Sequence, residues 1–175
     1  MKNLEIKQSL NDFRDITSRL RELKAHYKGQ LLQTDTYYFS SNGRLKIRET
    51  NNKKFEIISY QRPNKKKEKI SDYQIAKINK NDLKTSKNIY GFLGEKIIVK
   101  KKRNLWIYKH TRIHLDEVNK LGKFLELETV IKDIDTKQAR LEQNELKQKL
   151  NLSKNNNLKY SYSDLILNNQ YQYLN

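Results

Sequence analysis

The sequence has 175 residues, and its 37 Lys and Arg residues against 20 Asp and Glu give a formal net charge of +17. It contains no cysteine, which excludes disulfides, thiolate metal sites and cysteine nucleophiles, and no apolar run approaches the roughly 20 residues of a membrane-spanning helix. We therefore expect a single domain over residues 1–175 in a soluble, cytoplasmic protein that attracts polyanions, since the N-terminal residues also lack the apolar stretch of a signal peptide.

The predicted elements begin with a short strand over residues 3–7 and a helix over residues 9–29. In that helix apolar residues recur at helical spacing, Ser9 and Asp12 resemble the start of a capping box, and Gly29 marks the end. The segments that follow have the composition and length of strands. These strands are predicted over residues 33–39, 43–49, 54–63, 70–78, 95–108, 111–118 and 122–131.

Helices interrupt and close this series of strands. One is predicted around residues 81–94, with Ile89 on its apolar side. Another is predicted over residues 136–150 after Asp135 as its N-cap, and a short capped helix follows over residues 161–167. Many strands with few helices indicate an α+β domain built around an antiparallel sheet.

The charged faces of the strands allow two folds. Residues two apart share a face of a strand, and the strand over residues 43–49 carries Arg44, Lys46 and Arg48 on one side. This pattern alone favours an ordinary sheet with its charged face in water. However, the sign of the charge is sorted by strand, and aromatic residues such as Tyr37 and Tyr60 lie among the charges. These features favour a sheet curled around its charged face.

A closed barrel of about eight strands would leave room inside for a small ligand. Unpaired charges inside a dry barrel would be too costly to bury. Such an interior is therefore expected to hold water, metal and a multiply charged anion.

A series of motifs runs in order along nearly the whole chain: LEIK, QTDTYYF, GRLKIRE, ISYQRP, KISDY, VKKKR, RIHLDEV, LGKFLELE and SYSDLIL. Together they resemble the CYTH superfamily of triphosphate tunnel enzymes, and they are most similar to its class IV adenylyl cyclase-like branch. The resemblance implies a closed antiparallel β-tunnel with a charged lumen and helices outside, which binds a triphosphate together with Mg²⁺ or Mn²⁺.

The family signature Glu-x-Glu-x-Lys reads Asn3-Leu4-Glu5-Ile6-Lys7 in this chain. Glu5 and Lys7 match it, whereas Asn3 replaces the first Glu. An amide can offer a metal ion its carbonyl oxygen but no charge, so this replacement bears on the affinity for a second ion.

Glu126 and Glu128 are the expected metal ligands, with Glu5 as a third, because carboxylate oxygens suit Mg²⁺ and Mn²⁺. Arg binds phosphate through two hydrogen bonds and Lys as a point charge. The expected triphosphate contacts are Lys7, Lys46, Arg48, Arg62, Lys69, Lys101, Arg103 and Arg112, and the expected catalytic group is Lys7, Arg48, Lys101, Arg103 and Tyr37. The role of Arg44 stays open.

Five further residues are expected to support the site, namely Asn3, Asp35, Tyr60, His114 and Asp116. Asp35 suits the floor of the tunnel. His114 fits a structural hydrogen bonder better than a general base. Asp116 either joins the metal site or pairs with Arg112.

The leading hypothesis is a metal-dependent enzyme that converts ATP to cyclic AMP and pyrophosphate. The first alternative is a triphosphatase acting on thiamine triphosphate, inorganic triphosphate or a nucleoside triphosphate. A non-catalytic module that binds nucleotide or polyphosphate is the second, motivated by Asn3. The sequence has neither GxxxxGK[ST] nor GxGxxG, so P-loop and Rossmann mechanisms have no support.

The expected partner is a small molecule that contains a triphosphate. The charge of +17 also motivates nucleic-acid binding, but no platform of stacking aromatic residues supports it, and we expect neither nucleic acid nor membrane as a partner. The sequence predicts no oligomeric state.

Overall fold

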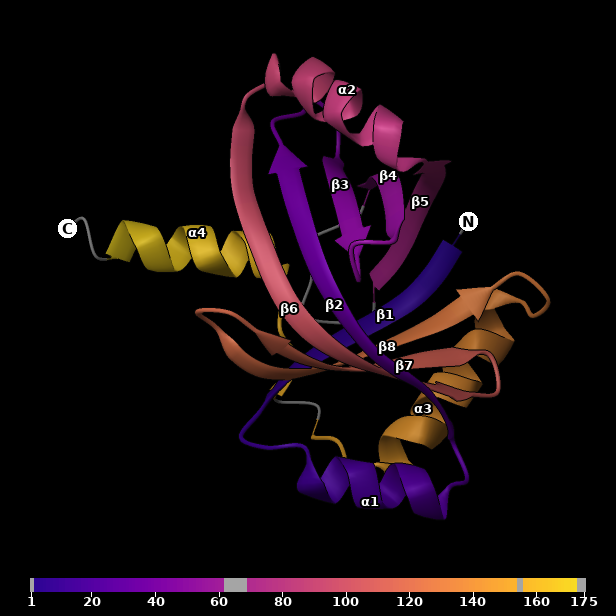
Figure 1. Ribbon diagram of the computed structural model, residues 1–175. Helices are drawn as coiled ribbons and strands as arrows, with labels where there is room; N and C mark the ends of the chain where they lie inside the picture. Colours follow the sequence, from indigo (N-terminus) through magenta and orange to yellow (C-terminus); the bar gives the residue numbers. More distant parts are fainter. Residues whose placement is uncertain (1, 62–68, 154–155, 173–175) are drawn as a thin grey trace.

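Alternating charged and apolar residues form strands that close into a barrel. The computed structural model describes residues 2–61, 69–153 and 156–172, which contain eight strands and four helices. The strands are β1 (Lys2–Leu10), β2 (His26–Tyr38), β3 (Arg44–Thr50), β4 (Lys54–Gln61), β5 (Lys69–Ile78), β6 (Glu95–Tyr108), β7 (Thr111–Val118) and β8 (Gly122–Ile131). The helices are α1 (Arg14–Glu22), α2 (Lys80–Gly91), α3 (Thr136–Lys149) and α4 (Tyr162–Gln172) (Figure 1).

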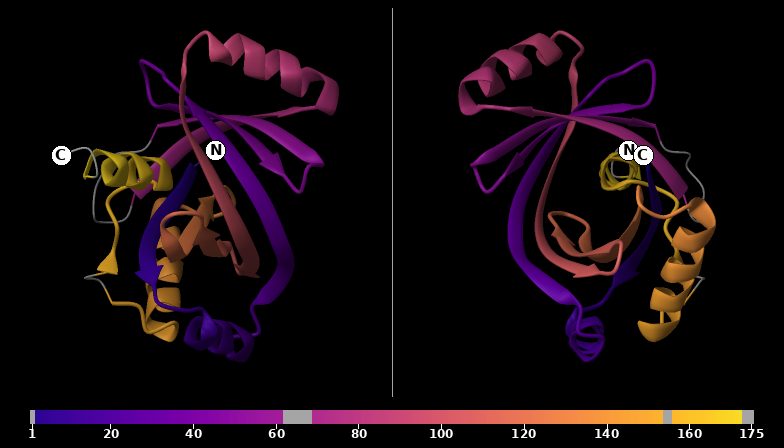
Figure 2. Two further views of the ribbon diagram at one scale, coloured as in Figure 1. Left: turned by 60° about the vertical axis from the view of Figure 1, so that its left-hand side comes forward. Right: turned by 90° about the vertical axis from the view of Figure 1, so that its right-hand side faces the viewer.

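The eight strands form a closed antiparallel barrel with the order β1-β5-β4-β3-β2-β6-β7-β8. The barrel closes because β1 pairs with β5 on one side and with β8 on the other. Figure 2 shows the strands curving around a common interior while the helices lie outside. The predicted barrel is therefore confirmed, and the flat sheet with its charged face in water is excluded.

The pairing register places opposite charges across from one another on the inner face. Lys7 of β1 lies opposite Glu126 of β8, and Asp35 of β2 lies opposite Arg48 of β3. Directly opposed side chains on one face start about 4.5–5.5 Å apart at Cβ. The register of the closed barrel thus assembles the ion pairs of the interior.

The main apolar core lies outside the barrel, between the strands and two helices. Helices α1 and α3 cover the outward faces of β1, β7 and β8 (Figure 1). Fully burying one such aliphatic side chain contributes about 1.5–3 kcal/mol, so this layer stabilises the barrel from outside. Its buried members include Ile6, Leu20, Ile113, Leu125, Leu127 and Leu146.

Helix α3 begins where the sequence predicts it to begin. The Asp135 side chain accepts a hydrogen bond from the backbone N–H of Gln138, and the Gln138 side chain accepts one from the N–H of Asp135. This capping box satisfies two N–H groups that the first helical turn leaves without partners. The helix is thereby fixed at its start, with Leu146 buried against the barrel.

The helix predicted over residues 9–29 is wrong at both ends. Strand β1 continues through Leu10, helix α1 starts only at Arg14, and β2 already begins at His26. Gly29 does not end the helix, because it lies at a bulge between β2 and β6 with φ of +105°. Strand pairing on both sides outweighs a local helical pattern, which is only a weak determinant of structure.

Helix α2 lies on the side of the molecule opposite α1 (Figure 1). None of its residues is buried and Ile89 is 59% exposed, although the ring of Tyr90 contacts that of Tyr38 with centroids 5.7 Å apart. The predicted apolar side of this helix is therefore only partly packed against the barrel. In the part of the chain that the structure describes, no helix is both long enough and apolar enough to cross a membrane.

Candidate active site

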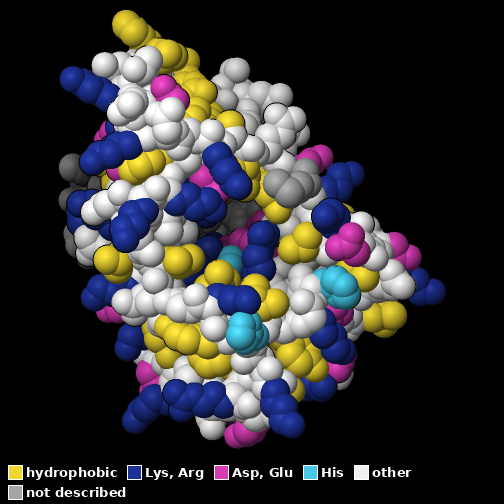
Figure 3. Space-filling model, turned by 45° about the vertical axis from the view of Figure 1, so that its right-hand side comes forward, with side chains coloured by type: hydrophobic (Ala, Val, Ile, Leu, Met, Phe, Trp, Pro, Cys, Tyr) yellow, Lys and Arg dark blue, Asp and Glu magenta, His cyan; other side chains and the backbone are white. Residues whose placement is uncertain are grey.

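The barrel encloses a cavity of about 330 Å³. This volume lies at the lower end of the range of small-molecule pockets. Among the described residues, seven Lys or Arg and five Asp or Glu line the cavity, so positive charge is in excess. Figure 3 shows a hollow on one face of the molecule, with Lys and Arg near its rim and acidic and His atoms visible inside.

Most of the residues that the sequence selects meet in this cavity. The structure places there Asn3, Glu5, Lys7, Asp35, Tyr37, Lys46, Arg48, Tyr60, Lys101, Arg103, Arg112, His114, Glu126 and Glu128. Arg62 lies outside the described residues, and so does the side chain of Lys69, although its backbone begins β5.

One side of the cavity, here called the cationic wall, consists of Lys46, Arg48 and Lys101 around Asp35. Arg48 donates from Nε and Nη2 to the two oxygens of Asp35, at 2.6 and 2.8 Å. The ammonium groups of Lys101 and Lys46 lie 2.8 and 3.0 Å from Oδ2 of the same carboxylate. Three cations share one carboxylate, so this wall carries more positive than negative charge.

The charges of the cationic wall shift one another's pKa values. Burial raises the pKa of Asp35, but the charges of Arg48, Lys101 and Lys46 outweigh it and hold that pKa well below its usual value. Burial lowers the pKa of Lys101 to about 7, and the nearby charge of Arg48 adds to this effect although Asp35 opposes it. Lys101 therefore carries its charge below about pH 7 and loses it as the pH rises.

We expect the affinity for inorganic tripolyphosphate to fall as the pH rises through about 7, because Lys101 loses its charge there. Lys101→Arg should remove this loss, since a guanidinium stays protonated. Titration calorimetry measures the affinity of the wild type and of the variant for tripolyphosphate at several pH values around 7. Protonation of tripolyphosphate affects both proteins equally, so a difference between them reports on Lys101. The same pH dependence in both proteins would contradict the assignment to Lys101.

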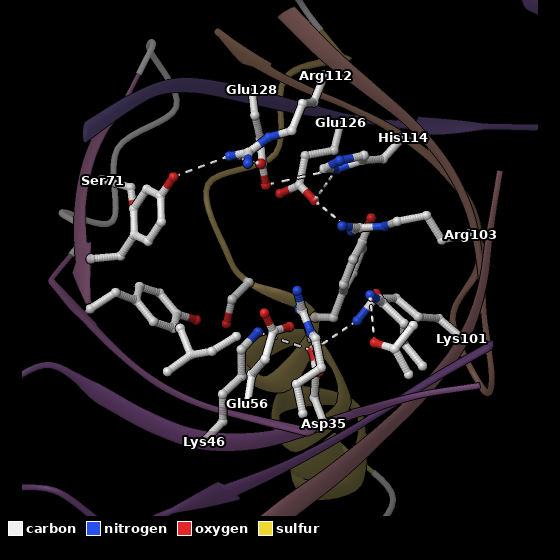
Figure 4. A pocket seen from close by; sticks show the side chains of 18 of the residues that line it. Asp35, Lys46, Glu56, Ser71, Lys101, Arg103, Arg112, His114, Glu126 and Glu128 are labelled. Carbon is white, nitrogen blue, oxygen red and sulfur yellow. Dashed lines mark hydrogen bonds and ion pairs between the residues drawn. The ribbon is translucent and has the colours of Figure 1, made fainter. Parts of the chain in front are cut away.

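The opposite side of the cavity, here called the acidic wall, consists of His114, Glu126 and Glu128 (Figure 4). The Nδ1 atom of His114 lies 3.6 Å from Oε2 of Glu126 and 3.7 Å from Oε1 of Glu128. One possible ligand atom from each of the three residues lies within 4.8 Å of the others. Two strands position this trio, because His114 on β7 lies opposite Glu126 on β8.

Three basic side chains hold the two carboxylates of the acidic wall. Lys7 lies 3.0 Å from Oε1 of Glu126, Arg103 lies 3.1 Å from its Oε2, and Arg112 lies 2.9 Å from Oε2 of Glu128. Burial raises the pKa of both carboxyls, but these and neighbouring groups outweigh it, with Lys7 the main opposing charge at Glu126. Both pKa values are lowered, so both groups stay ionised and can donate oxygen to a cation.

The chemistry of the acidic wall fits a divalent metal ion. Carboxylate oxygens are the ligands that Mg²⁺ and Mn²⁺ take from proteins, and imidazole nitrogen suits several transition ions. The structure thus shows a possible acidic metal site made by His114, Glu126 and Glu128. Glu5 lines the same cavity and lies opposite Glu128 in the register, but it is not a member of this trio.

Asp116 does not pair with Arg112, contrary to one of the two sequence interpretations. Arg103 contacts both its oxygens, at 2.7 and 2.6 Å, and the hydroxyl of Tyr162 donates to it at 2.9 Å. Because Arg112 lies opposite Glu128 in the register, it pairs with that carboxylate instead. Asp116 is fully buried, and its two hydrogen bonds with Arg103 hold that guanidinium toward the cavity.

Asn3 occupies a buried position next to the acidic wall. With its amide oriented to satisfy both neighbours, its oxygen accepts from Nη2 of Arg112 at 2.7 Å and its nitrogen donates to Tyr73 Oη at 3.3 Å. The amide thus contacts a cation where the family signature has a carboxylate. This contact places Asn3 beside the arginine that holds Glu128.

The start of α4 closes one side of the cavity. The ring of Tyr162 lies 3.6 Å from the ammonium of Lys7, measured to the ring centroid, and packs against Phe124 with centroids 5.1 Å apart. Asp164 in the same helix accepts a hydrogen bond from Nη2 of Arg44 at 2.9 Å. Arg44, whose role the sequence leaves open, therefore ties β3 to α4.

Sequence reasoning missed several residues of the lining, among them Glu56, Tyr73 and Tyr162. Glu56 lies opposite Arg48 in the register and shares its strand face with Tyr60. The apolar Ile58 lies between them on that face, so the face does not read as a continuous polar one in the sequence. Tyr73 lies two residues after Ser71 on β5, so period-two counting could have found it. Tyr162 belongs to a helix, and strand periodicity carries no signal for it.

The chain is similar over nearly its whole length to known proteins. It is 29% identical over 176 residues to a Methanocaldococcus jannaschii protein named “Putative adenylate cyclase”, with 94% of this chain and 98% of that protein covered. A protein of Pyrococcus horikoshii OT3 has a similar structure, with a TM-score of 0.79, 23% identity and coverage of 93% and 98% of the two chains.

A second solved structure carries a description of its activity. It is a Hippeastrum protein described as a “Putative adenylyl cyclase” with a dominant triphosphatase activity. It matches with a TM-score of 0.63 at 12% identity and covers 94% of each chain. At such identities the structural matches show a common fold.

The model of the CYTH domain family matches residues 1–162, which include all eight strands of the barrel and the start of α4. This match agrees with the charged interior and with the outward apolar faces of the strands. The chain belongs to the CYTH domain family.

Proposed function

We propose that this protein is a metal-dependent enzyme that acts on a triphosphate inside the barrel, and that it converts ATP to cyclic AMP and pyrophosphate. One observation carries the proposal: a cationic wall faces a possible metal site across the cavity inside the barrel (Figure 4). A triphosphate presents several negative charges to basic residues and to metal at once, so it suits both walls. The family match and the name of the Methanocaldococcus relative support this reaction.

The basic residues of the cavity are proposed to bind the phosphates. Lys46, Arg48 and Lys101 would exchange part of their contact with Asp35 for phosphate oxygens. Their attachment to β3 and β6 fixes them before the ligand arrives, which limits the ordering cost of binding. Tyr37 would position Lys46, since its hydroxyl accepts from that ammonium at 3.3 Å.

The acidic wall would add the second half of the site. Lys7, Arg103 and Arg112 lie there beside Glu126 and Glu128, within reach of phosphate oxygens that approach the carboxylates. When bound by Glu126 and Glu128, with Glu5 nearby, Mg²⁺ or Mn²⁺ would polarise the phosphate oxygens as a Lewis acid.

In the proposed cyclase reaction the ribose 3′-oxygen bonds to the α-phosphorus and its hydroxyl proton passes to water. The bond from that phosphorus to the bridging oxygen breaks, and pyrophosphate leaves with added negative charge. Fixed positive groups such as Arg48 and Arg103 would stabilise this charge as it develops. Arg103 is held for this role by both oxygens of Asp116.

Hydrolysis of a triphosphate is the second candidate, and the description of the Hippeastrum structure favours it. The same cations would serve both reactions, because the two differ in which phosphorus lies in line with the nucleophile. Thiamine triphosphate, inorganic triphosphate and nucleoside triphosphates are the substrates in question.

Mass analysis of products tests the proposal. The purified protein is incubated with Mn²⁺ or Mg²⁺ and, separately, with ATP, thiamine triphosphate and inorganic triphosphate. Cyclic AMP with pyrophosphate supports the cyclase, whereas a diphosphate with orthophosphate supports the triphosphatase. If all three compounds are recovered intact with either metal, the enzymatic proposal fails and a binding role replaces it.

A further inference from the structure

One ring nitrogen of His114 is buried beside two carboxylates without a hydrogen bond to either. The residue is 3% exposed, and its Nδ1 atom has no hydrogen-bond partner in the described part of the chain. Its nearest acidic oxygens lie 3.6 and 3.7 Å away on Glu126 and Glu128. These separations exceed the roughly 2.7–3.2 Å of an N–H···O hydrogen bond. Buried polar atoms usually have partners, so this nitrogen calls for an explanation.

The separations around Nδ1 are close to those that a shared cation would require. Ligands about 2.1 Å from an octahedral ion lie about 3 Å apart when adjacent and about 4.2 Å apart when opposite. The distances from Nδ1 to the two carboxylate oxygens fall between these values. Arg112 holds Oε2 of Glu128, so Oε1 of that residue is the oxygen turned toward His114.

We propose that His114 is a metal ligand together with Glu126 and Glu128, and that this mixed set favours Mn²⁺ over Mg²⁺. Mg²⁺ prefers oxygen ligands and water, whereas first-row transition ions also accept imidazole nitrogen. The inference rests on the proposed metal-dependent function and deepens it, because it assigns the third ligand and the preferred ion.

A purely structural role makes a different prediction. In that case His114 only bridges the two carboxylates as an imidazolium, and an ion would bind through oxygen atoms alone. Direct detection of nitrogen on the bound ion separates the two roles.

Pulsed EPR of bound Mn²⁺ provides that detection without any substrate. Protein of natural isotopic abundance and protein labelled with ¹⁵N-histidine each receive Mn²⁺ below one equivalent. We expect a nitrogen modulation that changes with the label, is lost in His114→Gln and is kept in His110→Gln. His110 is a matched control, since it also contacts a carboxylate, that of Glu142 at 2.9 Å, but lies outside the cavity and is more exposed. The labelling comparison needs no variant, so it holds even if His114→Gln folds poorly.

Metal titrations provide the second readout. Loss of even outer-shell partners lowers metal affinity by about 10–100-fold, so His114→Gln should weaken Mn²⁺ binding at least about 10-fold. Its affinity for Mg²⁺ should change much less, because the oxygen ligands remain. The preference for Mn²⁺ is thereby reduced.

The outcomes separate this inference from the proposed function. All-oxygen coordination of Mn²⁺ in the wild type, or no stoichiometric binding of Mn²⁺, overturns the ligand role of His114 whether or not the protein turns over a triphosphate. If nitrogen coordinates the bound Mn²⁺ but no triphosphate is turned over, the ligand role of His114 stands and only the enzymatic proposal fails.

Discussion

Asp35→Asn is expected to lower the free energy of unfolding by about 3–5 kcal/mol, the range found when one partner of a buried ion pair is removed. Asp35 is 1% exposed and is the common partner of Lys46, Arg48 and Lys101. Without its charge these three cations repel one another in a buried space. Urea denaturation of the wild type and the variant measures the change.

Tripolyphosphate should then stabilise Asp35→Asn more than it stabilises the wild type. A ligand that binds only the native state adds more stability when its dissociation constant is lower. In the variant the carboxylate of Asp35 no longer competes with the ligand for the three cations. Asp133→Asn, at an exposed position, serves as the control. A variant as stable as the wild type, with the same response to tripolyphosphate, would show that Asp35 does not hold the cationic wall together.

The double substitution Glu126→Gln and Glu128→Gln is expected to lower metal-dependent kcat by about 10³-fold or more. Loss of a single electrostatic contact to the transition state costs about 10²–10³-fold, and here two charged metal ligands are removed. Steady-state kinetics with Mn²⁺ measures the effect on whichever triphosphate the wild type consumes.

Binding of tripolyphosphate without metal distinguishes this loss from misfolding. It should be retained in the double variant, because two negative charges leave the cavity and the basic residues remain. Glu117→Gln changes an exposed carboxylate on β7 and should leave kcat unaltered. Turnover that persists in the double variant with unchanged dependence on Mn²⁺ would rule out the proposed metal ligands.

Alternation of residue types predicted the inner face of the barrel because it is a local property of each strand. The strands at 95–108, 111–118 and 122–131 have the predicted bounds. Comparing charges between strands indicated that Lys46 and Arg48 face inward, and both line the cavity. In these strands period two is enough to assign each side chain to a face.

Partners within the cavity could not be predicted in the same way. Asp116 pairs with Arg103 because β6 and β7 are in a particular register, which is a property of the folded barrel and not of either strand. Tyr162 reaches the cavity from a helix after the last strand, so only tertiary structure brings it to Lys7. The helix predicted over residues 9–29 was wrong for a related reason. Its first residues belong to strand β1 and its last residues to strand β2, and both strands are held by pairing in the barrel.

Calorimetric titration of tripolyphosphate into Lys101→Ala and Lys102→Ala, at about pH 6, tests the central claim that the interior binds the triphosphate. The two lysines are neighbours on β6 with the same charge, but Lys101 points into the cavity and Lys102 is exposed on the other face. A hydrogen bond from a charged group contributes about 1.5–3 kcal/mol, so Lys101→Ala should weaken binding at least about 10-fold while Lys102→Ala binds like the wild type. Equal weakening in both variants would show that the basic surface attracts the anion and would contradict a binding site inside the barrel.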